Sequence, residues 1–594
     1  MEPDSQALAE IEEAIALYGR GGLAQARNIC RGVLQRHPSH FDALHLLGVI
    51  AIQMNSFAEA AALIGKGLAT FPHHAAANFN HAVALTQMGR YDAALAAYDL
   101  SIQFGPPNVD AYCNRGAVLA ALKRYEDALA SYDQAFQLKP DFPALLGTRL
   151  YLKMLICDWR GLDRDTAALV EGIARGACVT SSLPILALTD SPSLQRDAAT
   201  IWTMAKYPPN AALGPAPSHA KHRKIRVGYF SMDFRDHPVS TLLAGVFEAH
   251  DREKFEITAF SYGPDTADPM RRRLEQTFDK FLDVRLRSDQ DIAALAREME
   301  IDIAVDLAGH TDGARSGIFA LRAAPIQVSY IGYPATMGAG YIDYIIADSV
   351  VIPEAARAHY TEKVVWLPNF QANDAKRIVA ERIFTRQELG LPPSGVVFCC
   401  FNNTYKITPD IFGGWMRILA RTPDSVLFLY ADTDSAAANL KAEAVARGVG
   451  AERLIFGKRL AVPEYLARYR AADLFLDTNP FNAGATASDA LWMGVPVLTR
   501  MGNSYVGRMA ASLLRSLDLP ELITSTGAEY EALAVALALD PARLQALKQK
   551  LARNRLASSL FDTVLFARRL ERAFDRMIEE QRAGQAPTHI YIEP

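Results

Sequence analysis

Cysteine is scarce in this chain of 594 residues, and the 6 that occur lack the C-x-x-C spacing of zinc and redox motifs. We therefore predict neither a cysteine-built metal site nor a disulfide framework. No apolar run reaches the roughly 18 residues that a membrane helix requires. The opening residues, MEPDSQALAEIEEA, are acidic, whereas the start of a secretory signal is basic. We expect a cytoplasmic protein with no membrane span.

An excess of charge of either sign is also missing. The 62 lysines and arginines are balanced by 66 aspartates and glutamates, which gives a formal net charge of −4 at pH 7. This balance provides no electrostatic footprint for a nucleic-acid partner. The G-x-G-x-x-G spacing of dinucleotide sites is absent from the turns after the first strands, and no G-x-S-x-G elbow occurs. These absences disfavour nucleic-acid binding, hydride transfer and serine-dependent hydrolysis.

A repeat of 34 residues dominates the first part of the chain. Prolines recur at this interval, and small and aromatic residues recur in phase with them: Pro38, Pro72, Pro106 and Pro140; Ala26, Ala60, Ala94 and Ala128; Phe57, Tyr91 and Tyr125. The period is the tetratricopeptide signature, in which each repeat is a helical hairpin that ends at a proline. We predict an α-solenoid of about four repeats over residues 1–142.

Two asparagines occupy equivalent positions of successive repeats, in NFNHAV and YCNRGA. Tetratricopeptide solenoids present a concave groove to a protein partner. Asn80 and Asn114 could therefore bind an acceptor protein through their amides. The alternative is that both asparagines lie on a solvated helix face.

The pattern changes after the repeats. Residues 143–222 stay helical at first and end in the proline-rich stretch PPNAALGPAPSHAKH, so we predict a helical connector followed by a linker. Strand-like apolar runs then alternate with helical segments in two series, over residues 223–385 and 386–594. This alternation predicts an α + α/β protein, in which the solenoid is followed by two Rossmann-like domains. Ligands of such folds bind in the cleft beyond the carboxyl ends of the strands.

The stretch DLFLDTNPFNAGATASDALWMGVPVL, residues 473–498, has the pattern of strand, polar loop, helix and strand. Gly484 and Ala485 are small enough for a ligand to approach the backbone closely. Thr486 and Asp489 match a capping box at the start of the helix. N–H groups exposed there, at the positive end of the helix dipole, favour an anionic ligand. The alternative is an ordinary helix cap with no ligand.

Cationic side chains follow several of the predicted strands. Lys406, in the polar loop after CCFNNTY, could neutralise a leaving diphosphate. His237, at the start of a predicted helix, could contact a phosphate or transfer a proton. His310 and Arg315, in AGHTDGAR, are further candidates for the same cleft. The plainer alternatives are a solvated lysine and a histidine that caps or packs a helix.

Several longer motifs occur in order along the chain: HPVS, GHTDGAR, APIQVSYIGYPATMG, DYIIAD, FNNTYKI, LDTNPFNAGATASDALWMGVPV and SSLFDT. Together with the repeats, they resemble the protein O-linked N-acetylglucosamine transferases, the family 41 glycosyltransferases, over essentially the whole chain. The resemblance implies a GT-B fold and metal-independent, inverting transfer of N-acetylglucosamine from UDP-GlcNAc to Ser or Thr of proteins. The nucleotide sugar would be a substrate, no cofactor is implied, and the tetratricopeptide groove would bind the protein acceptor.

The resemblance also implies roles for single residues. Lys406 would contact the β-phosphate, Asp489 the ribose and Tyr465 the uracil. His237 matches a histidine near the donor phosphates and is, with Lys406, a catalytic candidate. The donor-binding positions implied in this way are Asn403, Lys406, Leu460, Tyr465, Gly484, Ala485, Thr486 and Asp489.

Three features of the donor pocket depart from the animal enzymes. GAT at residues 484–486 replaces His-Thr-Thr, Asn403 replaces a glutamine, and Val462 replaces a lysine. Two alternatives therefore stay open: a flagellin-type glycosyltransferase that uses a CMP-activated nonulosonic acid, and an inactive tetratricopeptide scaffold that binds peptides. DTD at residues 432–434 resembles the metal-binding Asp-X-Asp of another glycosyltransferase class. That motif belongs to a single-sheet fold, so we assign no metal site to it.

Overall fold

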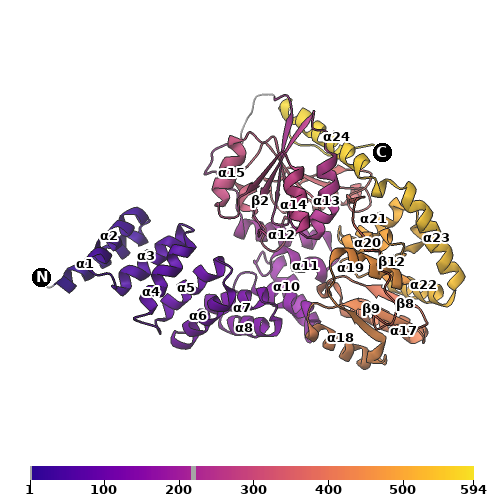
Figure 1. Ribbon diagram of the computed structural model, residues 1–594, viewed down its shortest axis with the longest axis horizontal. Coiled ribbons are helices and arrows are strands. Elements are labelled where there is room, and N and C mark those ends of the chain that lie inside the picture. Colours follow the sequence, from indigo (N-terminus) through magenta and orange to yellow (C-terminus); the bar gives the residue numbers. More distant parts are fainter. Residues whose placement is uncertain (1–2, 216–221, 594) are drawn as a thin grey trace. The chain divides into compact units, whose positions relative to one another are not determined.

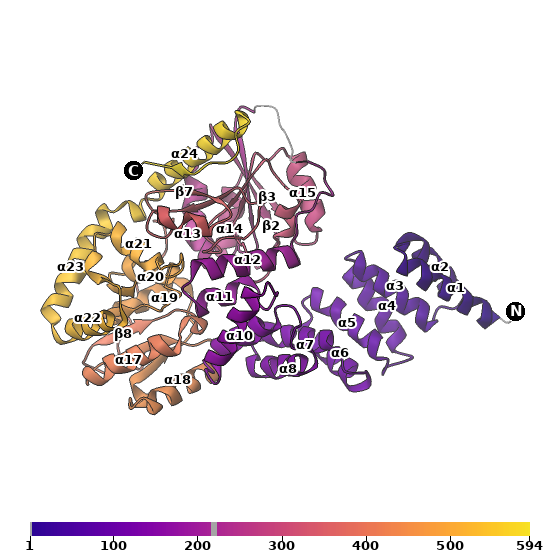
Figure 2. The ribbon, with the colours of Figure 1, turned by 180° about the vertical axis from the view of Figure 1, so that it is seen from behind.

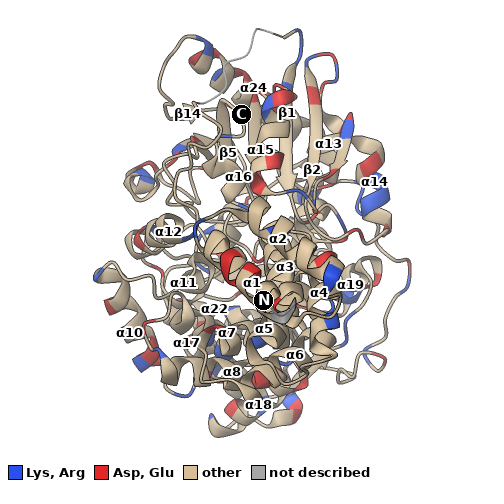
Figure 3. Cartoon of the chain, turned by 90° about the vertical axis from the view of Figure 1, so that its left-hand side faces the viewer, with Lys and Arg blue, Asp and Glu red and all other residues tan. Residues whose placement is uncertain are grey.

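The computed structural model describes residues 3–215 and 222–593. The chain divides into two compact units, Met1–Leu152 and Lys153–Pro594. Acidic and basic residues are interspersed along the ribbon, in keeping with the small net charge (Figure 3). No helix within the described ranges is long and apolar enough to cross a membrane.

The first unit is a succession of paired helices (Figure 1). Each helix packs against the helices that precede and follow it in the sequence. The helices are α1 (Pro3–Gly19), α2 (Leu23–Arg36), α3 (Phe41–Gln53), α4 (Phe57–Leu68), α5 (Ala75–Gln87), α6 (Tyr91–Phe104), α7 (Val109–Ala121) and α8 (Tyr125–Leu138). These hairpins confirm the predicted tetratricopeptide repeats.

Small residues allow the two helices of a hairpin to approach each other closely. The four alanines of the repeat pattern are fully buried. A Cβ at Gly48 would lie 2.4 Å from Cγ1 of Ile64, and one at Gly116 would lie 2.8 Å from Cε2 of Tyr132. Any side chain at these glycines would therefore force the helices apart, which explains why small residues recur at these positions.

The first unit extends beyond the predicted boundary at residue 142. Helix α9 (Leu145–Leu155) begins in this unit, which ends at Leu152. Arg149 of α9 donates to Asp133 of α8 at 2.7 Å and lies 4.3 Å from the ring centre of Phe136. This ion pair and the cation–π contact attach the start of α9 to the last repeat.

Within its described residues, the second unit contains two parallel sheets, of which the larger has 8 strands in the order β14-β7-β6-β5-β4-β1-β2-β3. Its strands are β1 (Ile225–Ser231), β2 (Phe255–Ser261), β3 (Lys280–Asp283), β4 (Ile303–Asp306), β5 (Ile326–Ser329), β6 (Tyr344–Ala347), β7 (Lys363–Trp366) and β14 (Ile590–Tyr591). The helices that accompany them are α13 (Pro238–Ala249), α14 (Pro269–Thr277), α15 (Asp289–Glu298), α16 (Gly317–Ala320) and α24 (Thr563–Arg582).

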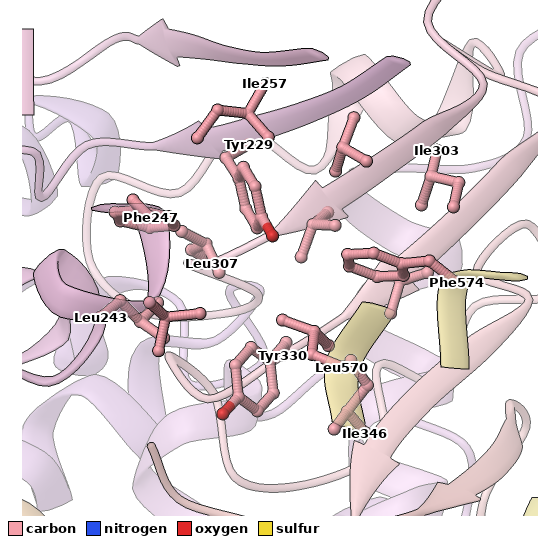
Figure 4. Packing of buried hydrophobic residues seen from close by; sticks show 14 of the residues in the cluster. Tyr229, Leu243, Phe247, Ile257, Ile303, Leu307, Tyr330, Ile346, Leu570 and Phe574 are labelled. Atoms are coloured by element: carbon pink, nitrogen blue, oxygen red, sulfur yellow. The ribbon is translucent and has the colours of Figure 1, made fainter. Parts of the chain in front are cut away.

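The core of this first-sheet domain combines strand and helix side chains (Figure 4). Tyr229 and Ile303 come from strands, Phe247 comes from α13, and Phe574 comes from α24. Strands β1, β4 and β5 are buried almost along their whole length because helices cover a parallel sheet on both faces. Each large apolar side chain buried in this way contributes roughly 1.5 to 3 kcal/mol.

The last helix and strand belong to the first sheet, which corrects the assignment of residues 386–594 to the second domain alone. Helix α24 packs against α13, as both ribbon views show (Figure 1, Figure 2). Strand β14 extends the sheet, with Ile590 opposite Val365. An apolar stripe shows that one face of a helix is buried but not which sheet covers that face, so the sequence pattern could not decide this.

The smaller sheet has 6 strands in the order β10-β9-β8-β11-β12-β13. Its strands are β8 (Val397–Cys400), β9 (Val426–Tyr430), β10 (Leu454–Gly457), β11 (Leu474–Leu476), β12 (Val497–Arg500) and β13 (Ile523–Thr524). Its helices are α17 (Pro409–Arg421), α18 (Asp434–Ala446), α19 (Val462–Arg468), α20 (Ala485–Trp492), α21 (Met509–Ser516), α22 (Gly527–Leu539) and α23 (Pro541–Ala557). The strand order reverses between β8 and β11, which is the switch point where such folds bind ligands.

Three helices connect α9 to the first sheet: α10 (Leu162–Ala174), α11 (Ser182–Leu188) and α12 (Pro192–Lys206). Of the predicted linker, residues 216–221 lie outside the described residues. The part before them is attached to the first-sheet domain, because Asn210 N donates to Ala320 O at 2.9 Å and the Arg297 guanidinium donates to the Leu213 carbonyl at 2.6 Å.

Candidate active site

Lys406 lies at the switch point of the second sheet, in the 3-10 turn Thr404–Lys406 after β8. Its ammonium donates to the Asn482 carbonyl at 3.2 Å and lies 3.8 Å from the ring centre of Phe481. Burial lowers the pKa of Lys406 to about 8, although the nearby Asp477 carboxylate opposes the shift. A partly desolvated cation in this position favours an anionic ligand, because it gains more from an anion than a fully hydrated lysine does.

Buried hydrogen bonds fix the loop that carries Lys406. Thr404 Oγ1 donates to the Leu155 carbonyl at 2.6 Å, and Asn402 Nδ2 donates to Thr478 Oγ1 at 2.7 Å. Asn402 Oδ1 in turn accepts from the hydroxyl of Thr486. The loop after β8 is thereby held against the start of α20. Asn403, the next residue, is exposed at the surface of this loop.

Asp477 forms the centre of the loop between β11 and α20. Its carboxylate accepts from Ala483 N at 2.7 Å, from Thr478 N at 2.8 Å and from Thr499 Oγ1 at 2.7 Å. Burial raises the pKa of Asp477 to about 7, against these hydrogen bonds. The buried carboxylate of Asp477 therefore fixes the conformation of the loop between β11 and α20. Nothing in the sequence around Asp477 indicated this role.

Helix α20 is not capped as the sequence predicted. Gly484 is the N-cap residue, and no side chain caps the first turn. Thr486 and Asp489 lie within the helix, where their side chains bind Asn402 and Arg377 instead of forming a capping box. The first backbone N–H groups of a helix have no partner inside it, so an uncapped start at the switch point favours an anion.

Asp489 is paired with an arginine that the sequence analysis did not single out. Arg377 Nη1 donates to Asp489 Oδ1 at 2.8 Å, and the two side chains are 1% and 15% exposed. Burial raises the pKa of Asp489 to about 6, whereas the Arg377 charge and a hydrogen bond from Tyr465 oppose the shift. Arg377 lies in the irregular segment between the two sheets, where no sequence period points to its partner.

Tyr465 joins the same cluster from α19. Its hydroxyl lies 2.9 Å from that of Tyr469, which donates to the Thr486 carbonyl at 3.2 Å.

Gln371, from the segment between the sheets, is a second residue that the sequence analysis missed. Its Oε1 would lie 3.5 Å from a Cβ at Gly484, and its buried Nε2 has no partner among the described residues. Ala485, at the first position of α20, is half-buried beside them.

A cavity of about 620 Å³ lies between the two domains, next to the cluster of Arg377, Asp489 and Tyr465. Residues from both domains line it, including Thr241 of α13, Arg377, and Ala461 and Val462 at the start of α19. Leu460, the preceding residue, is half-buried in the adjacent loop. The donor-binding positions predicted at Lys406, Tyr465, Thr486 and Asp489 do not line this cavity, and Asp489 is connected to it through its ion pair with Arg377.

His237 lies on the other side, at the start of α13. Its Nδ1 accepts from Val239 N at 3.4 Å and lies 3.5 Å from Asp233 Oδ2. Burial lowers its pKa, although Asp233 opposes the shift. The neighbouring Asp236 and Thr241 line the cavity between the sheets. His237 therefore both caps its helix and lies close to the cleft.

The other two cleft candidates are engaged elsewhere. His310 is buried, and its Nε2 lies 2.8 Å from the Met337 carbonyl and 3.1 Å from Thr203 Oγ1 of α12. Burial lowers the pKa of His310 to about 4. Arg315 is held by an ion pair with Asp289 at 2.6 Å. Neither residue lines the 620 Å³ cavity.

The two predicted acceptor-binding asparagines occupy matching positions on α5 and α7. Asn80 Nδ2 lies 2.9 Å from His45 Nε2, and Asn114 hydrogen-bonds Tyr98. Both asparagines are half-buried and each contacts the preceding helices. The two amides thus contact side chains of other repeat helices, Asn80 that of His45 on α3 and Asn114 that of Tyr98 on α6.

The two aspartates of the DTD motif lie in different local settings. Asp432 accepts from the Tyr430 hydroxyl at 2.8 Å, whereas Asp434 begins α18. Across the described ranges, no group of three or more His, Cys, Asp or Glu side chains is placed to hold a metal ion.

A tetratricopeptide solenoid followed by two Rossmann-like sheets, with a lysine and an open helix start at the switch point, defines a class of two-domain transferases. Glycosyl transferase family 41 matches residues 214–381 and 371–570, and tetratricopeptide repeat families match residues 11–64, 46–109 and 109–142. The chain belongs to glycosyl transferase family 41.

The chain is similar in sequence or structure to several named proteins. The chain is 34% identical over 466 residues to the probable UDP-N-acetylglucosamine–peptide N-acetylglucosaminyltransferase SEC of Arabidopsis thaliana, covering 75% of this chain and 48% of that protein. It is 26% identical to the UDP-N-acetylglucosamine–peptide N-acetylglucosaminyltransferase of Caenorhabditis elegans, covering 73% of this chain and 49% of the relative. The chain thus spans about half the length of these relatives. A lysine-to-methionine mutant of the Thermobaculum terrenum O-GlcNAc transferase superposes with a TM-score of 0.60 at 27% identity, covering 98% and 99% of the two chains.

Proposed function

We propose that this protein transfers N-acetylglucosamine from UDP-GlcNAc to Ser or Thr hydroxyls of protein acceptors in the cytoplasm. The reaction is inverting and uses neither a metal ion nor a cofactor. The observation that carries the proposal is the half-buried Lys406 side chain beside the uncapped start of α20, at the switch point of the second sheet. Membership of family 41 and the likeness to the bacterial O-GlcNAc transferase structure support the choice of donor.

In this reaction the acceptor hydroxyl attacks the anomeric carbon as the bond to the β-phosphate oxygen breaks. Negative charge then accumulates on the departing UDP, where Lys406 and the first N–H groups of α20 stabilise it. The unpartnered amide of Gln371 supplies a further donor near Gly484. Asp489 and Tyr465 hold the nucleoside end of the donor on the other side of α20.

The acceptor hydroxyl must lose its proton during the attack. His237 is the proton acceptor that we propose, because burial lowers its pKa and keeps the imidazole neutral near pH 7. Its helix α13 contributes Thr241 to the cavity between the sheets. The protein acceptor extends into the groove of the repeats, where Asn80 and Asn114 contact it.

The proposal is tested with purified protein, radiolabelled UDP-GlcNAc and a library of unmodified cytoplasmic proteins. Transfer of label to protein is expected, and labelled serine or threonine should be recovered after proteolysis. A thermal-shift comparison of UDP with CMP identifies the nucleotide, because a ligand that binds the folded state raises the melting temperature. A shift with CMP alone would favour the nonulosonic acid donor, and binding of neither nucleotide would favour the inactive scaffold.

A further inference from the structure

Asp190, in the turn between α11 and α12, binds a loop of the second-sheet domain. Its Oδ2 accepts from Asn503 N at 2.7 Å and from Asn503 Nδ2 at 3.0 Å. Its Oδ1 accepts from Ser504 N at 2.9 Å and from Ser504 Oγ at 2.8 Å. A carboxylate that receives two backbone and two side-chain donors makes a strong, charge-assisted contact.

Two glycines make room for this carboxylate. A Cβ at Gly502 would lie 2.6 Å from both oxygens of Asp190, and one at Gly507 would lie 2.8 Å from Oδ1. Neither glycine has a φ angle in the left-handed region, so the backbone itself would accept an alanine. The loop at residues 502–507 therefore leaves space for the Asp190 carboxylate because residues 502 and 507 have no side chain.

The same loop supports the partner of Lys406. Its Val506 carbonyl accepts from Asn482 N at 2.9 Å. Asn482 is fully buried, and its own carbonyl accepts from the Lys406 ammonium at 3.2 Å. A displacement of the 502–507 loop would thus move the carbonyl against which the ammonium is placed.

At its other end, the α11–α12 segment is built into the first-sheet domain. Thr203 of α12 donates to the Met337 carbonyl at 2.7 Å, and the Tyr333 hydroxyl donates to the Ser182 carbonyl at 3.2 Å. A Cβ at Gly338 would lie 2.4 Å from the backbone nitrogen of Thr200, so helix and loop are in close contact. Asp190 therefore links a segment fixed to the first sheet with the loop that supports Lys406.

We infer that Asp190 is a positioning residue for sugar transfer, which sets the Asn482 carbonyl and through it the ammonium of Lys406 relative to the first-sheet domain. The inference rests on the proposed role of Lys406 at the leaving diphosphate. Asp190 touches neither Lys406 nor the cleft, and it acts only through the 502–507 loop. Small misplacements of such groups reduce the rate of the chemical step more than they reduce binding.

Asp190→Asn is the first test, because it keeps the shape of the side chain but replaces one accepting oxygen by an NH₂ group. The loop stays attached through Arg508, which donates to the Gly502 carbonyl at 2.9 Å and also to the Val350 carbonyl, so the fold should survive. We expect kcat to fall roughly tenfold to a hundredfold and UDP affinity to fall by a smaller factor, because Lys406 contacts the diphosphate in the bound nucleotide as well as in the transition state. Gly502→Ala, which displaces the carboxylate without removing it, should have the same effect. Asp197→Asn, on the exposed side of α12, is the matched control and should leave kcat unchanged.

A second measurement does not depend on turnover. Acetic anhydride acylates only the neutral amine of a lysine, so the pH midpoint of Lys406 acylation, followed by peptide mass, reports on its surroundings. In Asp190→Asn and Gly502→Ala the midpoint should rise from the wild-type value near 8, because water reaches the displaced ammonium. An unchanged midpoint in both variants overturns the inference. Failure of the proposed function is a separate result, since it would appear as no sugar transfer by the wild-type protein.

Discussion

Arg377 Nη1 donates to Asp489 Oδ1 at 2.8 Å, so the residue expected at the donor ribose also holds the segment between the two sheets. Arg377 is fixed further by bonds to the Asn373 side chain at 2.7 Å and to the Asp374 carbonyl at 3.2 Å. The pair therefore connects α20 to the inter-sheet segment from within the protein. Its loss would affect the fold as well as the donor site.

Asp489→Ala should lower the free energy of unfolding by roughly 3 to 5 kcal/mol, because it removes the carboxylate that forms an ion pair with the buried Arg377 guanidinium. This loss exceeds the roughly 0.5 to 2 kcal/mol expected for a helix cap alone. Denaturant unfolding measures it, and calorimetry should show weaker UDP binding. The matched control is Asp434→Ala, which removes an exposed carboxylate from the start of α18. Equal effects of the two substitutions would contradict a structural role for the pair.

Lys406→Met should abolish most sugar transfer, by a factor of about one hundred to one thousand, because the leaving charge is no longer neutralised. The same change should stabilise the fold at pH 7 by about 1 to 3 kcal/mol, since a buried charge is replaced by an apolar side chain. The folded-state pKa of about 8 lies below the ordinary 10.5. The cost of the charge is thus full below pH 8 and disappears as the pH rises to 10.5, so the stability difference should shrink over that interval. Unfolding curves at several pH values test this, and a variant less stable than the wild type at every pH would refute it.

The pH profile of kcat/KM should have two limbs. Donor binding requires ionised Asp489, whose pKa is raised to about 6, and charged Lys406, whose pKa is lowered to about 8. Activity should therefore rise through pH 6 and fall through pH 8. Lys406→Arg supplies the control, because a guanidinium keeps its charge well above pH 8. A decline at high pH that persists unchanged in this variant would mean that another group causes it.

Sugar transfer should survive treatment with EDTA, because Lys406 and the start of α20 meet the charge of the leaving group. The measurement compares initial rates before and after chelation and dialysis. Loss of activity that manganese restores would contradict this expectation. It would direct attention to Asp432 and Asp434 as metal ligands.

The double change Asn80→Ala and Asn114→Ala should reduce modification of a protein acceptor by roughly thirtyfold in kcat/KM, since each of the two lost amide contacts is worth on the order of 1 kcal/mol. Hydrolysis of the donor by water needs no acceptor, and its rate should stay at the wild-type value. If the double variant modifies its acceptor at the normal rate, the row of asparagines serves the packing of the repeats through His45 and Tyr98.

The sequence by itself determined the elements and the class of site. The 34-residue period specifies helical hairpins because side-chain size must repeat wherever the same helix contact repeats, as at Gly48 and Gly116. Apolar runs separated by helical segments specify parallel sheets, and the polar loops after such strands locate Lys406 and α20. These patterns are local, so they can be read from the sequence without knowing which segments contact one another in the folded protein.

Tertiary structure decided which elements and side chains meet. Helix α24 and strand β14 return to the first sheet, Thr486 binds Asn402 instead of capping α20, and Asp489 pairs with Arg377. Asp190 lies 313 positions before Asn503 in the sequence and still binds it. From the sequence alone, one can say of a buried aspartate only that its carboxylate must accept hydrogen bonds. Which groups donate these hydrogen bonds depends on how the folded chain pairs all of its buried polar groups. A local sequence period carries no information about this pairing.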